Sequence, residues 1–257
     1  MVNYLLKKSY QLRNLKEIEF KDLWGDHGVF TTMWIFGRPP KILFFQNHIK
    51  NLVQSLGHYG IKKRFLKKEI IRLINLNIKK KFKYNHLLRI ALNKKTISIS
   101  LRKRLTPKLD FNLKLVNLKR EKPKYKNLKY KKILSYLSKM DNTKSDIALI
   151  NNNCLLETGT SNLLFVKDKK IYMPKKDYYK GITYKFLKSK IKKIFKKDIF
   201  IKDLSKYDEI LLVGSGKGIA SVKSINEINW KRKDLSQFRK FSNYYRLAIK
   251  KTKIYRF

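Results

Sequence analysis

The twelve residues from Leu155 to Val166 read LLETGTSNLLFV, and they place one glutamate, Glu157, between two apolar runs. Acidic residues are scarce, with 18 Asp and Glu among 257 residues. Burying an isolated charge costs free energy, so a carboxylate at such a place is either paired or functional. The alternative is that Glu157 ends a strand and faces water. Composition alone does not separate these two interpretations.

The elements around this stretch alternate between strands and helices. Apolar and β-branched runs predict strands at 41–45, 86–92, 96–101, 112–118, 146–150, 163–166, 171–173, 209–213 and 219–222. Apolar residues at helical spacing predict helices at 49–56, 65–76, 128–137, 182–195 and 235–249. We therefore expect an α+β or α/β fold.

A basic stretch with two prolines, residues 103–126, is the best candidate for a domain junction. We expect a small N-terminal α/β domain at 1–104, a linker at 105–122 and a larger C-terminal domain at 123–257. The length suits two modest domains or one large one.

The formal net charge is +45, which invites the interpretation that the chain binds nucleic acid. However, 51 of the 63 basic residues are lysines, whereas arginine is preferred for bidentate phosphate and base contacts. The lysines also lie in every segment rather than in one tail. General lysine enrichment explains the charge better, and no nucleic-acid partner is expected.

A lone cysteine, Cys154, excludes an intramolecular disulfide and zinc ribbons, and the four histidines show no metal-ligand spacing. No metal is expected. The N-terminus lacks a signal-peptide pattern, and no apolar run approaches the roughly 20 residues of a membrane span. The expected setting is cytoplasmic, without a membrane partner.

Several stretches, in order along the chain, resemble the signature of the fold-type IV (class IV) pyridoxal-phosphate enzymes. This family includes branched-chain aminotransferase, D-amino-acid aminotransferase and aminodeoxychorismate lyase. The stretches are WGDHGVFTT at 24–32, His48 with Leu52, KNLKY at 126–130, Glu157 with SNLLF at 161–165, Met173-Pro174, KGIT at 180–183 and DEILLVGSG at 208–216. The resemblance implies a two-domain, D-amino-acid aminotransferase-like fold, a homodimer and pyridoxal 5'-phosphate as cofactor.

The resemblance also implies roles for individual residues. Lys126 would hold the cofactor's aldehyde and move protons, with Lys124 and Lys129 as rivals. Glu157 would lie beside the pyridine nitrogen. The phosphate would lie against a helix start and a glycine-rich turn, at Ile182, Thr183, Ser215 and Gly216.

The chain departs from the family pattern at one phosphate-binding position. Asn51 stands where the family has an arginine, and Lys50 beside it is the expected replacement. For a small anionic substrate, the candidate ligands are Arg89, within a predicted strand, and Arg38.

The reaction is predicted from Phe30-Thr31-Thr32, which resembles aminodeoxychorismate lyases; Thr32 would assist proton transfer at the cofactor. The expected reaction converts 4-amino-4-deoxychorismate to 4-aminobenzoate and pyruvate, in folate precursor synthesis. The alternative is a transaminase acting on branched-chain or D-amino acids. A third hypothesis is a degenerate family member that binds nucleic acid or other anionic surfaces. Threonine is also a good strand former, so Thr31 and Thr32 could be ordinary strand residues.

Overall fold

The computed structural model describes residues 4–256, which divide into two compact units. Residues 4–104, 125–130 and 251–256 form the first unit, and residues 105–124 and 131–250 form the second. The chain therefore enters the second unit at residue 105, returns to the first for six residues, and leaves it again at 131.

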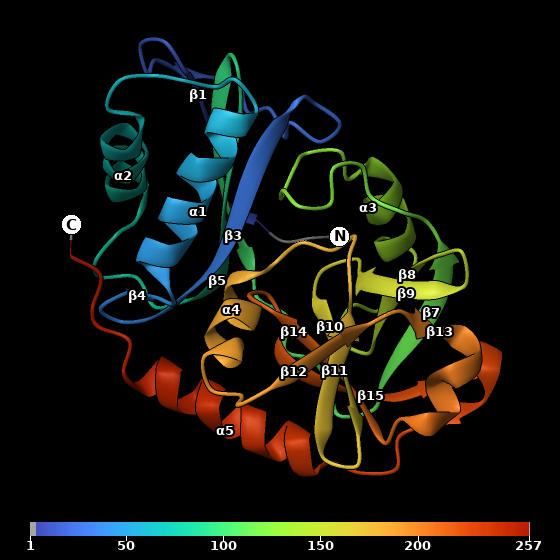
Figure 1. Cartoon of the computed structure of the whole chain (residues 1–257). Coiled ribbons are helices and arrows are strands. Elements are labelled where there is room, and N and C mark those ends of the chain that lie inside the picture. Colours follow the sequence, from blue (N-terminus) through green and yellow to red (C-terminus); the bar gives the residue numbers. More distant parts are fainter. Residues whose placement is uncertain (1–3, 257) are drawn as a thin grey trace. The chain divides into compact units, whose positions relative to one another are not determined.

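The first unit is a six-stranded antiparallel sheet with two helices on one face (Figure 1). The sheet order is β2-β1-β6-β5-β3-β4. The strands are β1 (Tyr4–Gln11), β2 (Glu17–Ile18), β3 (Gly28–Gly37), β4 (Lys41–Ile42), β5 (Tyr84–Asn93) and β6 (Thr96–Lys103), and the helices are α1 (Phe45–His58) and α2 (Leu66–Asn77).

Alternation along β3 gives the two faces of this sheet different environments. Val29, Met33 and Ile35 are fully buried in the core shared with α1 and α2. Side chains alternate between the faces of a strand, so Phe30 and Thr32 lie on the opposite face. That face carries a second apolar cluster, formed by Leu23, Phe30, Ala91 and Leu128.

The second unit is built on a sheet of order β12-β11-β10-β14-β15-β7-β8-β9-β13, with β16 paired to β15. Its strands are β7 (Phe111–Asn117), β8 (Ser145–Asn151), β9 (Cys154–Thr158), β10 (Asn162–Lys167), β11 (Lys170–Pro174), β12 (Ile194–Lys197), β13 (Ile199–Phe200), β14 (Glu209–Gly214), β15 (Gly218–Ile225) and β16 (Trp230–Lys231). The helices are α3 (Lys131–Leu137), α4 (Ile182–Lys188) and α5 (Ser236–Lys250).

Alternating residues of the central strands separate two cores in this unit. Leu163, Phe165 and Leu212 belong to one cluster, whereas Leu164 and Leu211 belong to another that includes Leu187 of α4 and Phe241 of α5. These runs are apolar on both faces because both faces are covered. The mixed α/β class expected from the sequence is confirmed.

Three predicted elements differ from the structure. The expected helix at 182–195 ends at Lys188, and Ile194 and Phe195 instead pair in parallel with β11, where the ring of Phe195 stacks on that of Tyr172 at 5.3 Å. The strand expected at 41–45 ends at Ile42, because Phe45 already begins α1. The helix expected from residue 128 begins at Lys131, because residues 125–130 belong to the first unit.

The segment expected as a linker, 105–122, contains strand β7. This strand lies between β15 and β8 in the sheet, and it is parallel to both. Phe111 in it is fully buried. The boundary between the units therefore lies close to residue 104, and the segment after it is structural core of the second unit.

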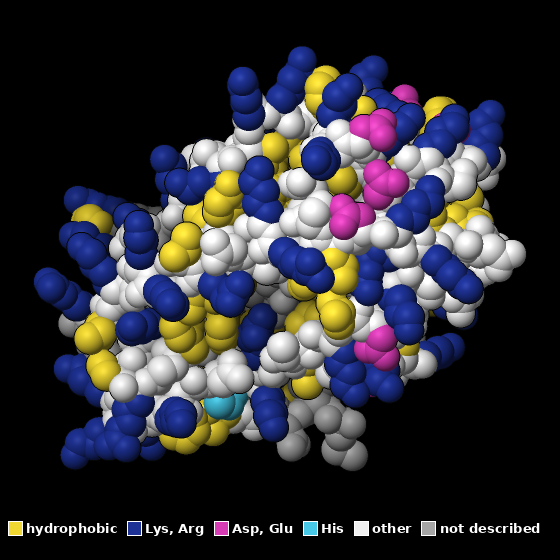
Figure 2. Space-filling view, turned by 90° about the horizontal axis from the view of Figure 1, so that it is seen from below, with side chains coloured by type: hydrophobic (Ala, Val, Ile, Leu, Met, Phe, Trp, Pro, Cys, Tyr) yellow, Lys and Arg dark blue, Asp and Glu magenta, His cyan; other side chains and the backbone are white. Residues whose placement is uncertain are grey.

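Basic side chains are spread across the surface. Figure 2 shows lysine and arginine side chains distributed over the whole face in view, with few acidic ones among them. This distribution agrees with general lysine enrichment and not with one concentrated patch on that face. Within residues 4–256, no helix is both long enough and apolar enough to cross a bilayer.

Candidate active site

Glu157 is buried and paired. It lies in β9, and its Oε1 accepts a hydrogen bond from Nε of Arg120 at 2.6 Å, with the two side chains 6% and 2% exposed. Its Oε2 accepts a hydrogen bond from the backbone N–H of Tyr179 at 3.1 Å. The structure thus excludes a water-facing Glu157 at a strand end, because both carboxylate oxygens have protein donors.

Asn162 connects the motif around Glu157 to the one at 180–183. Its Oδ1 accepts a hydrogen bond from the N–H of Gly181 at 3.1 Å, and its Nδ2 donates to the carbonyl of Tyr179. A Cβ on Gly181 would lie 2.8 Å from that Oδ1, so the loop approaches the amide closely. Two motifs about 20 residues apart in the sequence therefore form one hydrogen-bonded unit.

Two hydroxyl groups meet where that loop enters α4. Oγ1 of Thr183 and Oγ of Ser215 are 3.4 Å apart, and Thr183 is 1% exposed. Ser215 and Gly216 form the turn between β14 and β15. The two expected phosphate-binding segments thus lie side by side, each contributing a hydroxyl donor.

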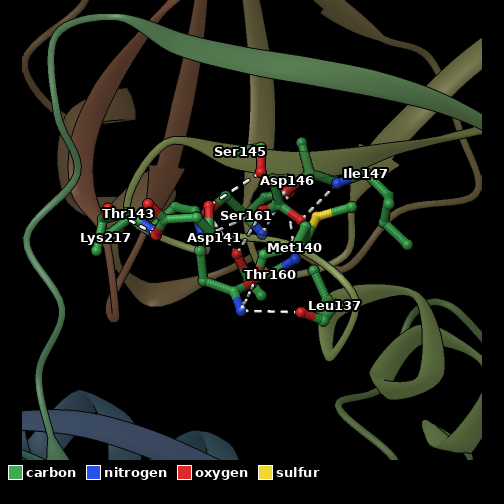
Figure 3. Close-up of polar contacts among 12 residues, drawn as sticks. Leu137, Met140, Asp141, Thr143, Ser145, Asp146, Ile147, Thr160, Ser161 and Lys217 are labelled. Atoms are coloured by element: carbon green, nitrogen blue, oxygen red, sulfur yellow. Dashed lines mark hydrogen bonds and ion pairs between the residues drawn. The ribbon is translucent and has the colours of Figure 1, made fainter.

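A buried ion pair holds the glycine-rich turn at residues 214–218 in place. Lys217 turns inward, with Nζ 3.4 Å from Oδ2 of the fully buried Asp146. The same oxygen accepts hydrogen bonds from the hydroxyls of Thr158, at 3.0 Å, and Thr160, at 2.6 Å. Figure 3 shows Asp146 beside Thr160. Lys217 therefore fixes the turn instead of pointing toward an outside anion.

Lys126 lies in the first unit, beside the start of β3. Its carbonyl accepts a hydrogen bond from the N–H of Phe30 at 2.9 Å, and the N–H of Leu128 donates to the carbonyl of Gly28 at 3.0 Å. A Cβ on Gly28 would lie 2.1 Å from the carbonyl oxygen of Leu92 and 2.8 Å from the side chain of Leu128. Position 28 requires glycine because strand β3, strand β5 and the segment around Leu128 come together there and leave no room for a side chain.

The amine of Lys126 lies against an aromatic ring, since its Nζ is 5.1 Å from the ring centroid of Phe30. Lys126 is half-buried, whereas its rivals Lys124 and Lys129 are exposed. The amine of Lys129 also donates to the carbonyl of Gly25 at 2.8 Å. Among these three lysines, Lys126 therefore has the least hydrated surroundings, which favour an amine that reacts.

Thr32 and Arg89 lie opposite each other on β3 and β5, on the sheet face that carries Phe30. Nη2 of Arg89 donates to the carboxylate of Asp22, and its guanidinium lies 4.4 Å from the ring of Trp24. The Nε of Arg89 is buried and has no hydrogen-bond partner among the described residues. This donor is available to an anion that enters this face.

The neighbouring Thr31 points to the opposite face and has a structural role. Its Oγ1 shares a 2.8 Å hydrogen bond with Nδ1 of His48 in α1, and both residues are buried. Burial and, secondly, the charge of Lys126 lower the pKa of His48 to about 3. His48 is therefore neutral at physiological pH.

We expect His48 to make the protein sensitive to acid. The unfolded chain binds a proton at this residue below about pH 6.5, whereas the folded protein does not until about pH 3. The contribution of neutral His48 to the free energy of unfolding is complete above about pH 6.5. It is lost as the pH falls from about 6.5 to about 3. Between pH 7 and 4, the wild type should lose about 3 kcal/mol more unfolding free energy than His48→Asn.

Urea denaturation at several pH values measures this difference. The matched control is His27→Asn, which replaces an exposed histidine of the same unit. Parallel pH dependences for the wild type and His48→Asn would contradict the assignment.

The remaining predicted residues are more dispersed. Lys50 is exposed on α1, and Arg38 is exposed after β3. Ile182 is 6% exposed at the first position of α4, and Gly216 lies in the turn after β14. Within residues 4–256, no hydrogen bond or ion pair ties Lys50 or Arg38 to a site, so their assignments stay predictions.

Sequence reasoning missed Arg120, Asp146 and Lys217. The signal for Asp146 was its place inside a predicted apolar strand of a chain that has few carboxylates. Arg120 is one of only 12 arginines, and it stands six residues before Lys126. Lys217 had no signal, since it is one lysine among 51. No group of His, Cys, Asp and Glu within residues 4–256 could hold a metal ion.

Comparisons with known proteins agree with these motifs. The sequence model of the amino-transferase class IV family matches residues 28–225. No curated protein is significantly similar in sequence.

Solved structures share the fold at low sequence identity. A branched-chain aminotransferase from Thermoproteus uzoniensis, solved with norvaline, has a TM-score of 0.78 at 15% identity, covering 97% of this chain and 96% of its own. A Legionella pneumophila protein provisionally assigned as a 4-amino-4-deoxychorismate lyase has a TM-score of 0.68 at 18% identity, covering 86% and 91%. A hypothetical aminotransferase from Mycobacterium tuberculosis, in its PLP-bound form, has a TM-score of 0.68 at 13% identity, covering 95% and 99%.

Proposed function

Because the chain belongs to the class IV aminotransferase family, whose cofactor is pyridoxal 5'-phosphate, we propose that it converts 4-amino-4-deoxychorismate to 4-aminobenzoate and pyruvate. The observation that carries this proposal is the position of Thr32. It shares a sheet face with Phe30, whose ring contacts the Lys126 amine, and it lies opposite Arg89. The homodimer and cytoplasmic setting expected from the sequence are part of the same proposal.

The residues present fit the cofactor. Its aldehyde requires an amine, and the half-buried Lys126 provides one. Its ring nitrogen requires a fixed carboxylate, which Glu157 provides. Its phosphate requires several donors, and Thr183 and Ser215 contribute adjacent hydroxyls. The missing arginine at Asn51 is offset by a net charge of +45, which favours anions around the protein.

Each of these residues has a defined part in the proposed reaction. Pyridoxal phosphate, when bound, supplies an aldehyde that condenses with amines and a ring that accepts electrons. The Nζ of Lys126 removes the proton from the ring carbon of the substrate and returns a proton to the leaving enol. The hydroxyl of Thr32 assists this transfer, and Arg89 binds a substrate carboxylate through its unpartnered Nε. Glu157 stabilises a protonated ring nitrogen.

Two substrate assays test the proposal. With 4-amino-4-deoxychorismate, the protein should release 4-aminobenzoate and pyruvate in equal amounts. With branched-chain or D-amino acids and 2-oxoglutarate, it should form no glutamate. The opposite result would identify a transaminase, and a protein that takes up no cofactor would favour the degenerate anion binder.

Thr32→Val should distinguish a catalytic role of the Thr32 hydroxyl from an ordinary structural role of this residue in strand β3. The variant keeps the shape of the side chain and removes its hydroxyl, so we expect kcat to fall roughly 100-fold while cofactor binding stays unchanged. The matched control is Thr31→Val on the opposite face, which should lower stability by removing the bond to His48 while changing kcat little. Equal kcat for Thr32→Val and the wild type would exclude a role for this hydroxyl.

A further inference from the structure

We propose that Arg120 is a positioning residue that holds Glu157 ionised and correctly oriented toward the ring nitrogen of the cofactor. This inference rests on the proposed function, because that function assigns Glu157 to the ring nitrogen. Arg120 is not expected to contact the substrate; its effect passes through the carboxylate.

The contacts around the pair fix both side chains. Nε of Arg120 donates to Oε1 of Glu157 at 2.6 Å, and its Nη2 donates to the carbonyl of Pro123 at 3.0 Å. Oε2 of Glu157 accepts from the backbone N–H of Tyr179 at 3.1 Å. Three segments of the second unit, residues 120–123 and those around Glu157 and Tyr179, are thereby connected through one ion pair.

Burial makes this pairing necessary. The Arg120 side chain is 2% exposed and that of Glu157 is 6% exposed, so water cannot solvate either charge fully. A carboxylate buried without a partner tends to take up a proton, whereas an adjacent guanidinium keeps it ionised. Arginine suits this place better than lysine, because its planar group can bind the carboxylate and a carbonyl at once.

The contacts of the carboxylate also bear on the ring nitrogen. Both oxygens of Glu157 accept hydrogen bonds from protein donors, one from a guanidinium and one from a backbone N–H. A proton shared between Glu157 and a ring nitrogen would stay on the nitrogen, because Arg120 stabilises the ionised carboxylate. Arg120 thus supports a charged ring without being near the reacting carbon.

The segment that contains Arg120 also leads to Lys126. Only five residues separate the two, and residues 125–130 belong to the first unit whereas Arg120 belongs to the second. One short stretch of chain therefore carries both the proposed amine and the group that orients the proposed carboxylate.

The test compares Arg120→Met, Arg120→Lys, Glu157→Gln and the double variant Arg120→Met/Glu157→Gln with the wild type. The matched control is Arg232→Met, which replaces another arginine of the second unit that hydrogen-bonds Ser221 and the carbonyl of Leu109. Three quantities are measured: the urea midpoint of the cofactor-free protein, the Kd for pyridoxal phosphate, and the ¹⁵N chemical shift of the labelled ring nitrogen in the bound cofactor.

We expect Arg120→Met to weaken cofactor binding roughly 10- to 100-fold, the range found when a residue that orients a metal ligand is removed. Its ring-nitrogen signal should move toward that of an unprotonated pyridine, and Arg120→Lys should restore that signal in part because it restores the charge. The double variant should match Glu157→Gln in Kd and in the ring-nitrogen signal, and its urea midpoint should be higher because it removes the unpaired buried guanidinium. Arg232→Met should leave the ring-nitrogen signal unchanged.

Two results would overturn the inference: an unchanged ring-nitrogen signal in Arg120→Met, or additive effects of Arg120→Met and Glu157→Gln on Kd. Either would reduce Arg120 to a structural residue. A wrong proposed function would give a different result: the wild type itself would then bind no pyridoxal phosphate or form no product. The urea midpoints of the cofactor-free variants still report whether the two residues act as a unit.

Discussion

Lys126→Ala abolishes the visible absorption band of the covalently bound cofactor and lowers kcat by about 1,000-fold or more. The reason is that this one amine both holds the cofactor and moves the proton, and a methyl group does neither. The backbone of residue 126 is held by the N–H of Phe30, and alanine keeps that hydrogen bond. The fold should therefore survive, and the variant should still bind pyridoxal phosphate noncovalently.

Absorption spectra of purified protein with added pyridoxal phosphate provide the measurement, and borohydride reduction followed by peptide mapping identifies the modified lysine. Lys129→Ala is the matched control, because it removes a nearby exposed amine that binds the carbonyl of Gly25. A band that persists in Lys126→Ala and disappears in Lys129→Ala would move the role to Lys129.

Asp146→Ala lowers the free energy of unfolding by about 3–5 kcal/mol, the usual cost of leaving one partner of a buried ion pair alone. The variant leaves the ammonium of Lys217 without its carboxylate and removes the acceptor of two threonine hydroxyls. Because Lys217 adjoins Ser215 and Gly216, affinity for pyridoxal phosphate should fall as well.

Urea denaturation of the cofactor-free protein measures the loss of stability. Asp110→Ala provides the control, since it replaces an exposed aspartate of the same unit and should change stability by no more than about 0.5 kcal/mol. The ion pair would be energetically unimportant if Asp146→Ala matched that control. Lys217→Met should remove the cost in the Asp146→Ala background in part, because it removes the unpaired charge.

Most secondary structure was predictable because local patterns are strong in this chain. The helices α1, α2 and α5 follow apolar spacing, and the strands around the glycine-rich turn follow β-branched runs. The prediction failed at 189–195, where lysines and isoleucines fit a helix as well as a strand. Pairing with β11, about 20 residues earlier in the chain, decides the outcome there.

The candidate site was predictable in part, because its motifs are also local patterns of residue type and spacing. Motif order and spacing pointed to Glu157, Thr183, Ser215 and Lys126, and the structure places Thr183 beside Ser215. The supporting residues were not predictable, because no local pattern connects Arg120 to Glu157 or Asp146 to Lys217 across 37 and 71 residues. Such pairs form only when strands bring distant segments together.

The sequence by itself determined the family, the order of its motifs and the apolar faces of its helices and strands, because these depend on residue type and spacing. Only the tertiary structure decided which charges are buried and with which partners. The glutamate between its two apolar runs shows the difference. The scarcity of acidic residues marked Glu157 as important, but its pairing depends on an arginine that folding places 2.6 Å away. In the same way, the pairing of β3 with β5 and its packing on α1 decide that Thr31 binds His48 and that Thr32 lies opposite Arg89.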